Sequence, residues 1–297
     1  MQVVVASLIF AGCAAVAHAE QPGPAVEKAS AGDYPLDPGF AARARHLDLK
    51  SSSVLVVEQD GGKLLYAKNT QAVVPIASIT KLMTAMVVLD AQLALDEPVR
   101  ISGDDIDDIK GTRSRLKVGT ELTRSDLLRL ALMSSENRAA AALTRAYPGG
   151  SAAFVRAMNQ KAIELSMWRT RFVDGTGLSS DNVSTARDLV KMVNAAFRYP
   201  LVRSYTTDTD HAVRSAKGRP LQYRNSNGLV KNPSWHIGLS KTGYISEAGR
   251  CLVMQAEIAD IPVVIVLLDS WGKQTRIGDA NRIKKWLESH SARQPAG

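Results

Sequence analysis

Apolar segments with the lengths of β-strands lie at both ends of this chain, and the segments between them have helical periodicity. Near the start, residues 54–57 and 64–67 are apolar runs separated by Asp-Gly-Gly, which is typical of a hairpin turn. Near the end, strand-like runs cover residues 237–243, 249–258 and 262–268. This order, without strand–helix–strand alternation, predicts an α+β fold. We expect one antiparallel sheet made from both chain ends, packed by helices, with a helical insertion that forms a second lobe.

The central part of the chain predicts a series of helices. Residues 78–93 are apolar around most of the helical circumference, which indicates a helix that is buried on several sides. Other helices are expected at residues 123–133, 138–147, 151–165, 185–197 and, after the last strand, 275–289. The tetrapeptide Ser-Ser-Glu-Asn interrupts the helical pattern between the first two of these. The cleft between the helical lobe and the sheet is the expected active site.

The N-terminal part of the chain predicts export. An apolar run at residues 3–17 leads into Ala-His-Ala, the small-residue pattern that precedes signal-peptide cleavage. We therefore expect a signal peptide at residues 1–19, an extended proline-rich leader at residues 20–47, and a released periplasmic protein. The run is short for a membrane-spanning helix. Acylation of Cys13 is the less favoured alternative, because Phe10 stands where a lipoprotein cleavage box has leucine.

Composition argues against several classes of ligand. The chain has 37 basic and 29 acidic residues, a net charge of +8, but the basic residues are scattered and only 5% of residues are aromatic. Nucleic-acid binding is therefore not expected, whereas an anionic polymer such as cell-wall material suits this surface. Cys251, the one cysteine left after signal removal, lies in an apolar run and is expected to be a buried, inert thiol. No cofactor or metal is expected, because the remaining histidines lack ligand spacing: His46, His211, His236 and His290.

The first motif with chemical potential is S-x-x-K at the start of the buried helix. Ser78 and Lys81 are separated by about one helical turn and so lie on the same face. A lysine can take the proton of a serine hydroxyl if burial or a neighbouring cation lowers its pKa. The backbone N–H of Ser78, at a helix N-terminus, is suited to stabilise an oxyanion.

Two further motifs offer groups that bind a peptide and move protons. Ser135 and Asn137 form S-x-N in the break between two helices, where a hydroxyl can relay a proton and a carboxamide can hold a substrate amide. Lys241 and Thr242 precede Gly243 in an expected strand, and a glycine at this point lets a substrate backbone approach closely.

Each motif is weak by itself. S-x-x-K recurs at residues 114–117, in a charged loop, and S-x-N recurs at residues 180–182, in a turn-rich stretch; we interpret the first of these as a chance match. The ordered set is more specific, because S-x-x-K opens a buried helix, S-x-N separates two helices and K-T-G lies on a late strand. This set is the signature of penicillin-binding proteins and serine β-lactamases.

With the surrounding segments VPIASITKLMT, MSSENRAA, DGTGL and SKTGY, the chain resembles the penicillin-interacting serine D,D-peptidases, especially their low-molecular-mass D-alanyl-D-alanine endopeptidases. The resemblance implies a β-lactamase/transpeptidase-like catalytic domain at residues 48–289, with residues 290–297 as a tail. It also implies hydrolysis of D,D cross-links between peptidoglycan stem peptides through a serine acyl-enzyme, inhibition by penicillin, and a part in cell-wall organisation and cell shape.

The resemblance assigns roles to the residues of the first two motifs. Ser78 would be the acylated nucleophile and Lys81 the base that activates it. Ser135 would shuttle a proton toward the leaving amine, and Asn137 would bind the substrate amide.

The remaining roles concern the substrate carboxylate and the oxyanion. Lys241 and Thr242 would hold the carboxylate end of the substrate, and the charge of Lys241 would lower the pKa of Lys81. The backbone N–H groups of Ser78 and Tyr244 would form the oxyanion hole. The glycine-containing loop at residues 174–178 either borders the cleft or only makes turns.

Several alternatives stay open at this point. Efficient β-lactam hydrolysis is not expected, because the chain has no E-x-x-x-N to supply a deacylating carboxylate. A D-alanyl-D-alanine carboxypeptidase is an alternative, although such enzymes commonly continue into a C-terminal β domain and anchor helix. A catalytically silent β-lactam or wall-fragment binding protein is another. The expected partners are peptidoglycan stem peptides, with β-lactams as covalent inhibitors; no stable membrane span and no particular wall hydrolase is predicted.

Overall fold

The computed structural model describes residues 47–59 and 62–291. The expected signal peptide, Cys13, nearly all of the expected leader and most of the expected tail lie outside these residues. Among the helices described, none combines the length and the apolar character that crossing a bilayer requires.

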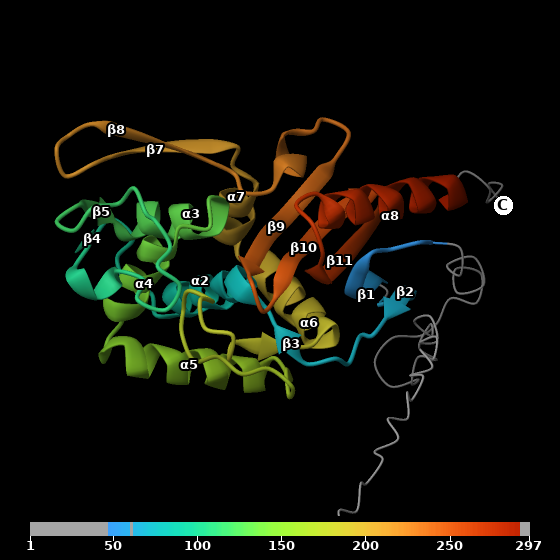
Figure 1. The fold of residues 1–297 in the computed structure, drawn as a ribbon, viewed down its shortest axis with the longest axis horizontal. Helices are drawn as coiled ribbons and strands as arrows, with labels where there is room; N and C mark the ends of the chain where they lie inside the picture. Colours follow the sequence, from blue (N-terminus) through green and yellow to red (C-terminus); the bar gives the residue numbers. More distant parts are fainter. Residues whose placement is uncertain (1–46, 60–61, 292–297) are drawn as a thin grey trace, which may run out of the picture.

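Strands from both ends of the chain form one sheet, which confirms the predicted α+β architecture (Figure 1). Its order is β2-β1-β11-β10-β9, and every neighbouring pair is antiparallel. The two ends meet where β1 pairs with β11, from Ser51 opposite Ser270 to Glu58 opposite Val263. The strands are β1 (Ser51–Glu58), β2 (Leu64–Lys68), β9 (His236–Ile245), β10 (Gly249–Ile258) and β11 (Ile261–Ser270).

Both faces of this sheet are covered, and this explains why its strands have continuous apolar sequences. On β11, Val263 and Ile265 pack in the cluster beneath the C-terminal helix α8 (Thr275–Ser291). Val264 and Val266 point to the opposite face and pack in the cluster formed with the central helices. Successive side chains of a strand alternate between faces, so two buried faces require apolar residues at consecutive positions.

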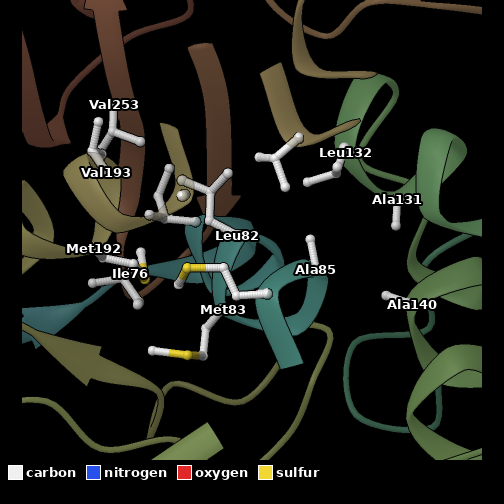
Figure 2. Packing of buried hydrophobic residues seen from close by; sticks show 14 of the residues in the cluster. Ile76, Leu82, Met83, Ala85, Ala131, Leu132, Ala140, Met192, Val193 and Val253 are labelled. Carbon is white, nitrogen blue, oxygen red and sulfur yellow. The ribbon is translucent and has the colours of Figure 1, made fainter. Parts of the chain in front are cut away.

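The helical lobe is built around α2, which is buried on nearly all sides as the sequence predicts. Figure 2 shows Leu82 and Met83 of α2 among side chains such as Val193 of α6 and Val253 of β10. The first turn of the predicted helix is a separate 3-10 turn, so the α-helix itself begins at Thr80. The helical elements are η1 (Ala77–Ile79), α2 (Thr80–Asp90), α3 (Arg124–Met133), α4 (Asn137–Arg145), α5 (Gly150–Glu164), α6 (Ala186–Phe197) and α7 (Pro200–Thr207).

A hairpin between α7 and β9 has no counterpart among the sequence expectations. Its strands β7 and β8 are mostly exposed, and Val213 and Tyr223 are their buried positions. One face of the hairpin carries His211, Val213, Leu221 and Tyr223, and the other carries its charged residues. His211 and an outward alanine interrupt the alternation in β7, and a proline begins β8, so neither five-residue strand shows a clear strand pattern. The shorter elements and this hairpin are β3 (Val74–Pro75), β4 (Pro98–Arg100), η2 (Gly103–Asp105), β5 (Glu121–Thr123), β6 (Val183–Ser184), β7 (Asp210–Arg214), β8 (Pro220–Arg224) and η3 (Gly228–Lys231).

Candidate active site

The turn that carries Ser78 lies where the helical lobe meets the sheet, at the start of α2. Ala77, which precedes the serine, has a φ of 48°, a left-handed conformation that is uncommon for a residue with a side chain. Ser78 is partly exposed, whereas Lys81, one turn later, is 1% exposed. The Nζ atom of Lys81 donates to Ser78 Oγ at 2.7 Å. The two residues are therefore in the direct contact that their spacing predicts.

The other hydrogen bonds of Lys81 orient its amine. Nζ also donates to Asn137 Oδ1 at 2.7 Å and to the backbone oxygen of Thr176 at 2.6 Å. A neutral amine has two N–H bonds and one lone pair. If Asn137 and Thr176 take the two N–H bonds, the lone pair is left for the hydroxyl of Ser78. The site thus holds a proton acceptor against its serine.

Burial makes Lys81 a base near neutral pH. It lowers the pKa of Lys81 to about 7, while the carboxylates of Asp174, Glu136 and Asp107 act in the opposite direction. A lysine with its ordinary pKa near 10.4 would be almost fully protonated at pH 7 and could not accept the serine proton. A buried lysine with a pKa of about 7 is unprotonated in about half of the molecules at that pH.

The S-x-N motif fills the break between α3 and α4. Ser135 has a left-handed φ of 60°, and Asn137 is the first residue of α4. The Nδ2 group of Asn137 donates to Thr112 Oγ1 at 3.0 Å, so both ends of the carboxamide have partners. Ser135 Oγ accepts a hydrogen bond from Lys241 Nζ at 2.9 Å. The break between the helices therefore contacts both lysines of the site: Asn137 binds Lys81, and Ser135 binds Lys241.

The K-T-G motif lies on β9, which forms one edge of the sheet. Lys241 is 1% exposed, and burial, followed by the positive charges of Lys81 and Arg276, holds its pKa well below the ordinary value. The repulsion expected between the two lysines thus acts on Lys241, whereas burial is what lowers the pKa of Lys81. Thr242 Oγ1 donates to Ser226 Oγ at 2.7 Å.

Two glycines allow other segments to touch the nucleophile turn. A Cβ on Gly177, whose φ is 79°, would lie 2.1 Å from the carbonyl oxygen of Ala77. A Cβ on Gly243 would lie 2.9 Å from the carbonyl oxygen of Ile76 and 3.2 Å from Ser78 N. The glycine of K-T-G thus admits the protein's own backbone, and the close approach of a substrate backbone stays a prediction. The loop containing Gly177 borders the site, so the first of its two interpretations holds.

Comparison with known proteins identifies this arrangement. The peptidase S11 family, described as D-alanyl-D-alanine carboxypeptidase, matches residues 40–272. The chain belongs to the S11 peptidase family.

Relatives and solved structures agree with this assignment. A D-alanyl-D-alanine endopeptidase of Pseudomonas aeruginosa is 51% identical over 82% of this chain and 78% of its own length. A D-alanyl-D-alanine endopeptidase of Escherichia coli is 48% identical over 84% of this chain and 81% of its own. The structure of the Streptomyces K15 DD-transpeptidase is 28% identical, with a TM-score of 0.75 over 82% of this chain and 98% of that one. The S11 peptidase described here is a serine-type D,D-peptidase with a transpeptidase-like fold.

The carboxylates around Lys81 in this S11 peptidase are occupied by hydrogen-bond donors. Asp174 accepts from the backbone N–H groups of Thr176 and Gly177, at 2.6 and 2.7 Å, and from the Asn182 side chain at 3.0 Å. Asp107 accepts from the backbone N–H of Thr112 and of two other residues, and Glu136 accepts from the backbone N–H of Arg138. These hydrogen bonds occupy acceptor sites of the three carboxylates. Asn182, from the second S-x-N match, supports the loop beside the nucleophile.

Sequence reasoning missed Arg276, in the first turn of α8. Its positive charge contributes to the low pKa of Lys241. Within the described part of the chain, its buried Nε and Nη1 atoms have no hydrogen-bond partner. A guanidinium group with free donors is suited to a carboxylate. No local pattern marks Arg276, because its proximity to Lys241 results from packing α8 against the sheet.

Other residues considered in the sequence lie apart from this chemistry. Cys251 is fully buried and burial raises the pKa of its thiol to about 12, as expected of an inert cysteine. Ser114, in the second S-x-x-K match, bonds to the backbone of Leu116. Across residues 47–59 and 62–291, no group of three or more histidine, cysteine or acidic side chains is arranged to hold a metal.

Proposed function

We propose that this S11 peptidase is an exported D-alanyl-D-alanine endopeptidase that hydrolyses D,D cross-links between peptidoglycan stem peptides. The contact between the Ser78 hydroxyl and a buried Lys81 amine with a pKa of about 7 carries the proposal of a serine acyl-enzyme. The preference for cross-links is supported by the two relatives at 51% and 48% identity, both named D-alanyl-D-alanine endopeptidase.

In the proposed acylation step, Lys81 removes the proton of Ser78 and the serine oxygen attacks the carbonyl carbon of a D-alanyl residue. The negative charge that develops on the carbonyl oxygen is met by the backbone N–H groups of Ser78 and Tyr244. The closeness of Ser78 N to Gly243, the residue before Tyr244, supports this pairing. Asn137, held between Lys81 and Thr112, offers its amide to the peptide on the acyl side.

The scissile C–N bond then breaks, and the leaving amine must gain a proton. Ser135 is the proposed donor, because its hydroxyl accepts a hydrogen bond from Lys241 Nζ and keeps its own hydrogen free to donate. A proton given to the amine by Ser135 is replaced by one from Lys241. The proton that Lys81 took from Ser78 then passes to solvent, and Lys241 regains one. With Lys81 neutral again, water attacks the ester at Ser78 as it gives a proton to Lys81, and Lys81 returns that proton to Ser78 Oγ as the ester bond breaks.

Lys241, Thr242 and Arg276 are the proposed partners of the substrate carboxylate beside the scissile bond. A carboxylate that enters this group raises the pKa of Lys241, because it supplies the opposite charge that the empty site lacks. Binding therefore protonates the lysine that the leaving step needs. The free donors of Arg276 add a bidentate contact that no other side chain in this group supplies.

Penicillin should acylate the same serine and leave it slowly. The carboxylates nearest to Lys81 accept hydrogen bonds from backbone donors, so none is free to assist Lys81 in activating water, and release of the drug should be slower than in an enzyme with a dedicated deacylating carboxylate. Export to the periplasm is proposed from the N-terminal apolar run and the Ala-His-Ala pattern.

A carboxypeptidase that trims a terminal D-alanine is the second candidate, favoured by the description of the family. The deciding experiment incubates the purified protein with cross-linked muropeptide dimers and with pentapeptide monomers, beside the Ser78→Ala variant. Conversion of dimers to monomers by the wild type alone, read by chromatography and mass spectrometry, supports the endopeptidase. Loss of terminal D-alanine with dimers intact supports the carboxypeptidase. No change in either substrate contradicts both.

A further inference from the structure

A cavity lined mainly by basic residues lies beside the S-x-N motif. It has a volume of ≈ 530 Å³ and lies between the loop that precedes Leu116 and the hairpin β7–β8. Ser134 and Glu136, the neighbours of Ser135, form part of its wall. Three arginines line the rest: Arg113, Arg115 and Arg224. The hairpin that the sequence did not predict therefore supplies one wall of a cavity next to the catalytic motif.

The positive charge of this cavity is largely uncompensated. Among the described residues, Arg113 and Arg224 have no ion-pair or side-chain hydrogen-bond partner. Arg115 is fixed by a hydrogen bond to the Gln222 carbonyl at 2.6 Å and by stacking 3.9 Å above the Tyr223 ring. Glu136 is the acidic residue in the wall, so three positive charges face one negative charge.

A buried polar group in the same wall also lacks a partner. The side chain of Tyr223 is 2% exposed, and its hydroxyl finds no hydrogen bond among the residues described. A buried hydroxyl without a hydrogen-bond partner is destabilising unless a ligand or water completes it. The arginines and this hydroxyl are all donors, which suits an anion with several acceptor oxygens, such as a carboxylate.

The position of the cavity indicates which part of a substrate can reach it. In the proposed function, Ser135 protonates the leaving amine, and the residues on both sides of Ser135 form the wall of the basic cavity. A different cavity, of ≈ 400 Å³, adjoins Asn137 and Thr176 on the acyl side. The basic cavity therefore lies on the side from which the leaving group departs. The carboxylate next to the scissile bond is already assigned to Lys241 and its neighbours. A carboxylate bound in the basic cavity must therefore be a different carboxylate of the leaving group.

We propose that the basic cavity binds an additional carboxylate of the leaving stem peptide, through Arg113, Arg224 and the hydroxyl of Tyr223. This inference rests on the proposed endopeptidase function and adds a determinant of its specificity. A single D-alanine, the leaving group of a carboxypeptidase, has one carboxylate and cannot occupy both places. A cross-linked stem carries further carboxylates and can. The cavity thus favours the long leaving group over the short one.

The test measures binding without turnover, in the Ser78→Ala background. The probes are two cross-linked peptide dimers that differ at one position: the carboxyl group of the leaving stem remote from the scissile bond is either free or a carboxamide. We expect the free-carboxyl dimer to bind about tenfold more tightly. In Arg113→Gln/Arg224→Gln the two dimers should bind equally, at the weaker value. The matched control is Lys217→Gln/Arg219→Gln, which removes two exposed charges from the turn of the same hairpin, outside the cavity, and should keep the discrimination.

Two further measurements separate the possible failures. With Ser78 present, the rate of acylation by a fluorescent penicillin should be the same in the cavity variant and in the wild type, because penicillin has no leaving stem. A parallel fall in that rate would indicate a structural role and overturn the inference, as would equal binding of both dimers to the protein with its cavity intact. If the protein with Ser78 fails to cleave dimers, the proposed function fails, while the binding comparison still decides the role of the cavity.

Discussion

Acylation of Ser78 by a fluorescent penicillin should rise with pH through the pKa of Lys81. Lys81 Nζ donates a hydrogen bond to Ser78 Oγ when the amine is charged, and the neutral amine can instead accept the hydrogen of the serine hydroxyl. Burial lowers the pKa of Lys81 to about 7, so this reversal falls within the range in which the protein can be assayed.

The size of the effect follows from that pKa. With a value of about 7, the neutral amine makes up about one eleventh of the protein at pH 6 and about ten elevenths at pH 8. The second-order acylation rate should therefore increase about tenfold between these pH values and level off above them. Lys241 carries part of the same titration because the two charges repel each other, so the observed midpoint belongs to the pair.

The assay follows covalent labelling with time at several penicillin concentrations, in buffers of constant ionic strength from pH 5 to pH 9. Glu136→Gln removes a carboxylate that raises the pKa of Lys81, so its midpoint should move to lower pH. A rate that stays constant between pH 6 and pH 8 would refute the role of Lys81 as base. A midpoint near the ordinary lysine value would refute the lowering of the Lys81 pKa by burial, and a shift of the Glu136→Gln midpoint to higher pH would refute the charge effect of Glu136.

Three other outcomes follow from the geometry. Gly177→Ala should slow penicillin labelling at least about tenfold, because its Cβ would lie 2.1 Å from the Ala77 carbonyl oxygen. Gly150→Ala, also at a positive φ but with open space around it, should label at the normal rate. Equal labelling rates in the two variants would contradict the close packing of Gly177 against the nucleophile turn. Arg276→Gln should raise KM for cross-linked dimers about tenfold, whereas Lys285→Gln on the same helix should leave KM unchanged. An unaltered KM in Arg276→Gln would show that Arg276 does not bind the substrate carboxylate. Intact-protein mass spectrometry should detect a long-lived penicillin adduct that is missing from Ser78→Ala, and rapid release of hydrolysed drug would count against a site without a free deacylating carboxylate.

Much of the architecture could be predicted from local patterns. The continuous apolar runs of β10 and β11, and the buried helix that begins near Ser78, follow from which faces of each element are covered. The sequence did not predict the hairpin β7–β8 because each strand has five residues, with His211 at an inward position of one and a proline at the start of the other, and only Val213 and Tyr223 of its two strands are buried. The sequence did not predict the 3-10 turn at Ala77, because its left-handed residue is an alanine, a residue type that is not typical of turns.

The sequence by itself determined which chemical groups are available and on which elements they lie: a serine and a lysine one turn apart, a hydroxyl and a carboxamide in a helix break, and a lysine and threonine on a strand. Only the tertiary structure decided what each group does to the others. Thr176, 95 positions beyond Lys81, accepts its hydrogen bond, and Arg276 lies close enough to affect the pKa of Lys241. The physical reason is range: propensity and periodicity act over a few residues, whereas burial and charge act through space on whatever the fold brings together.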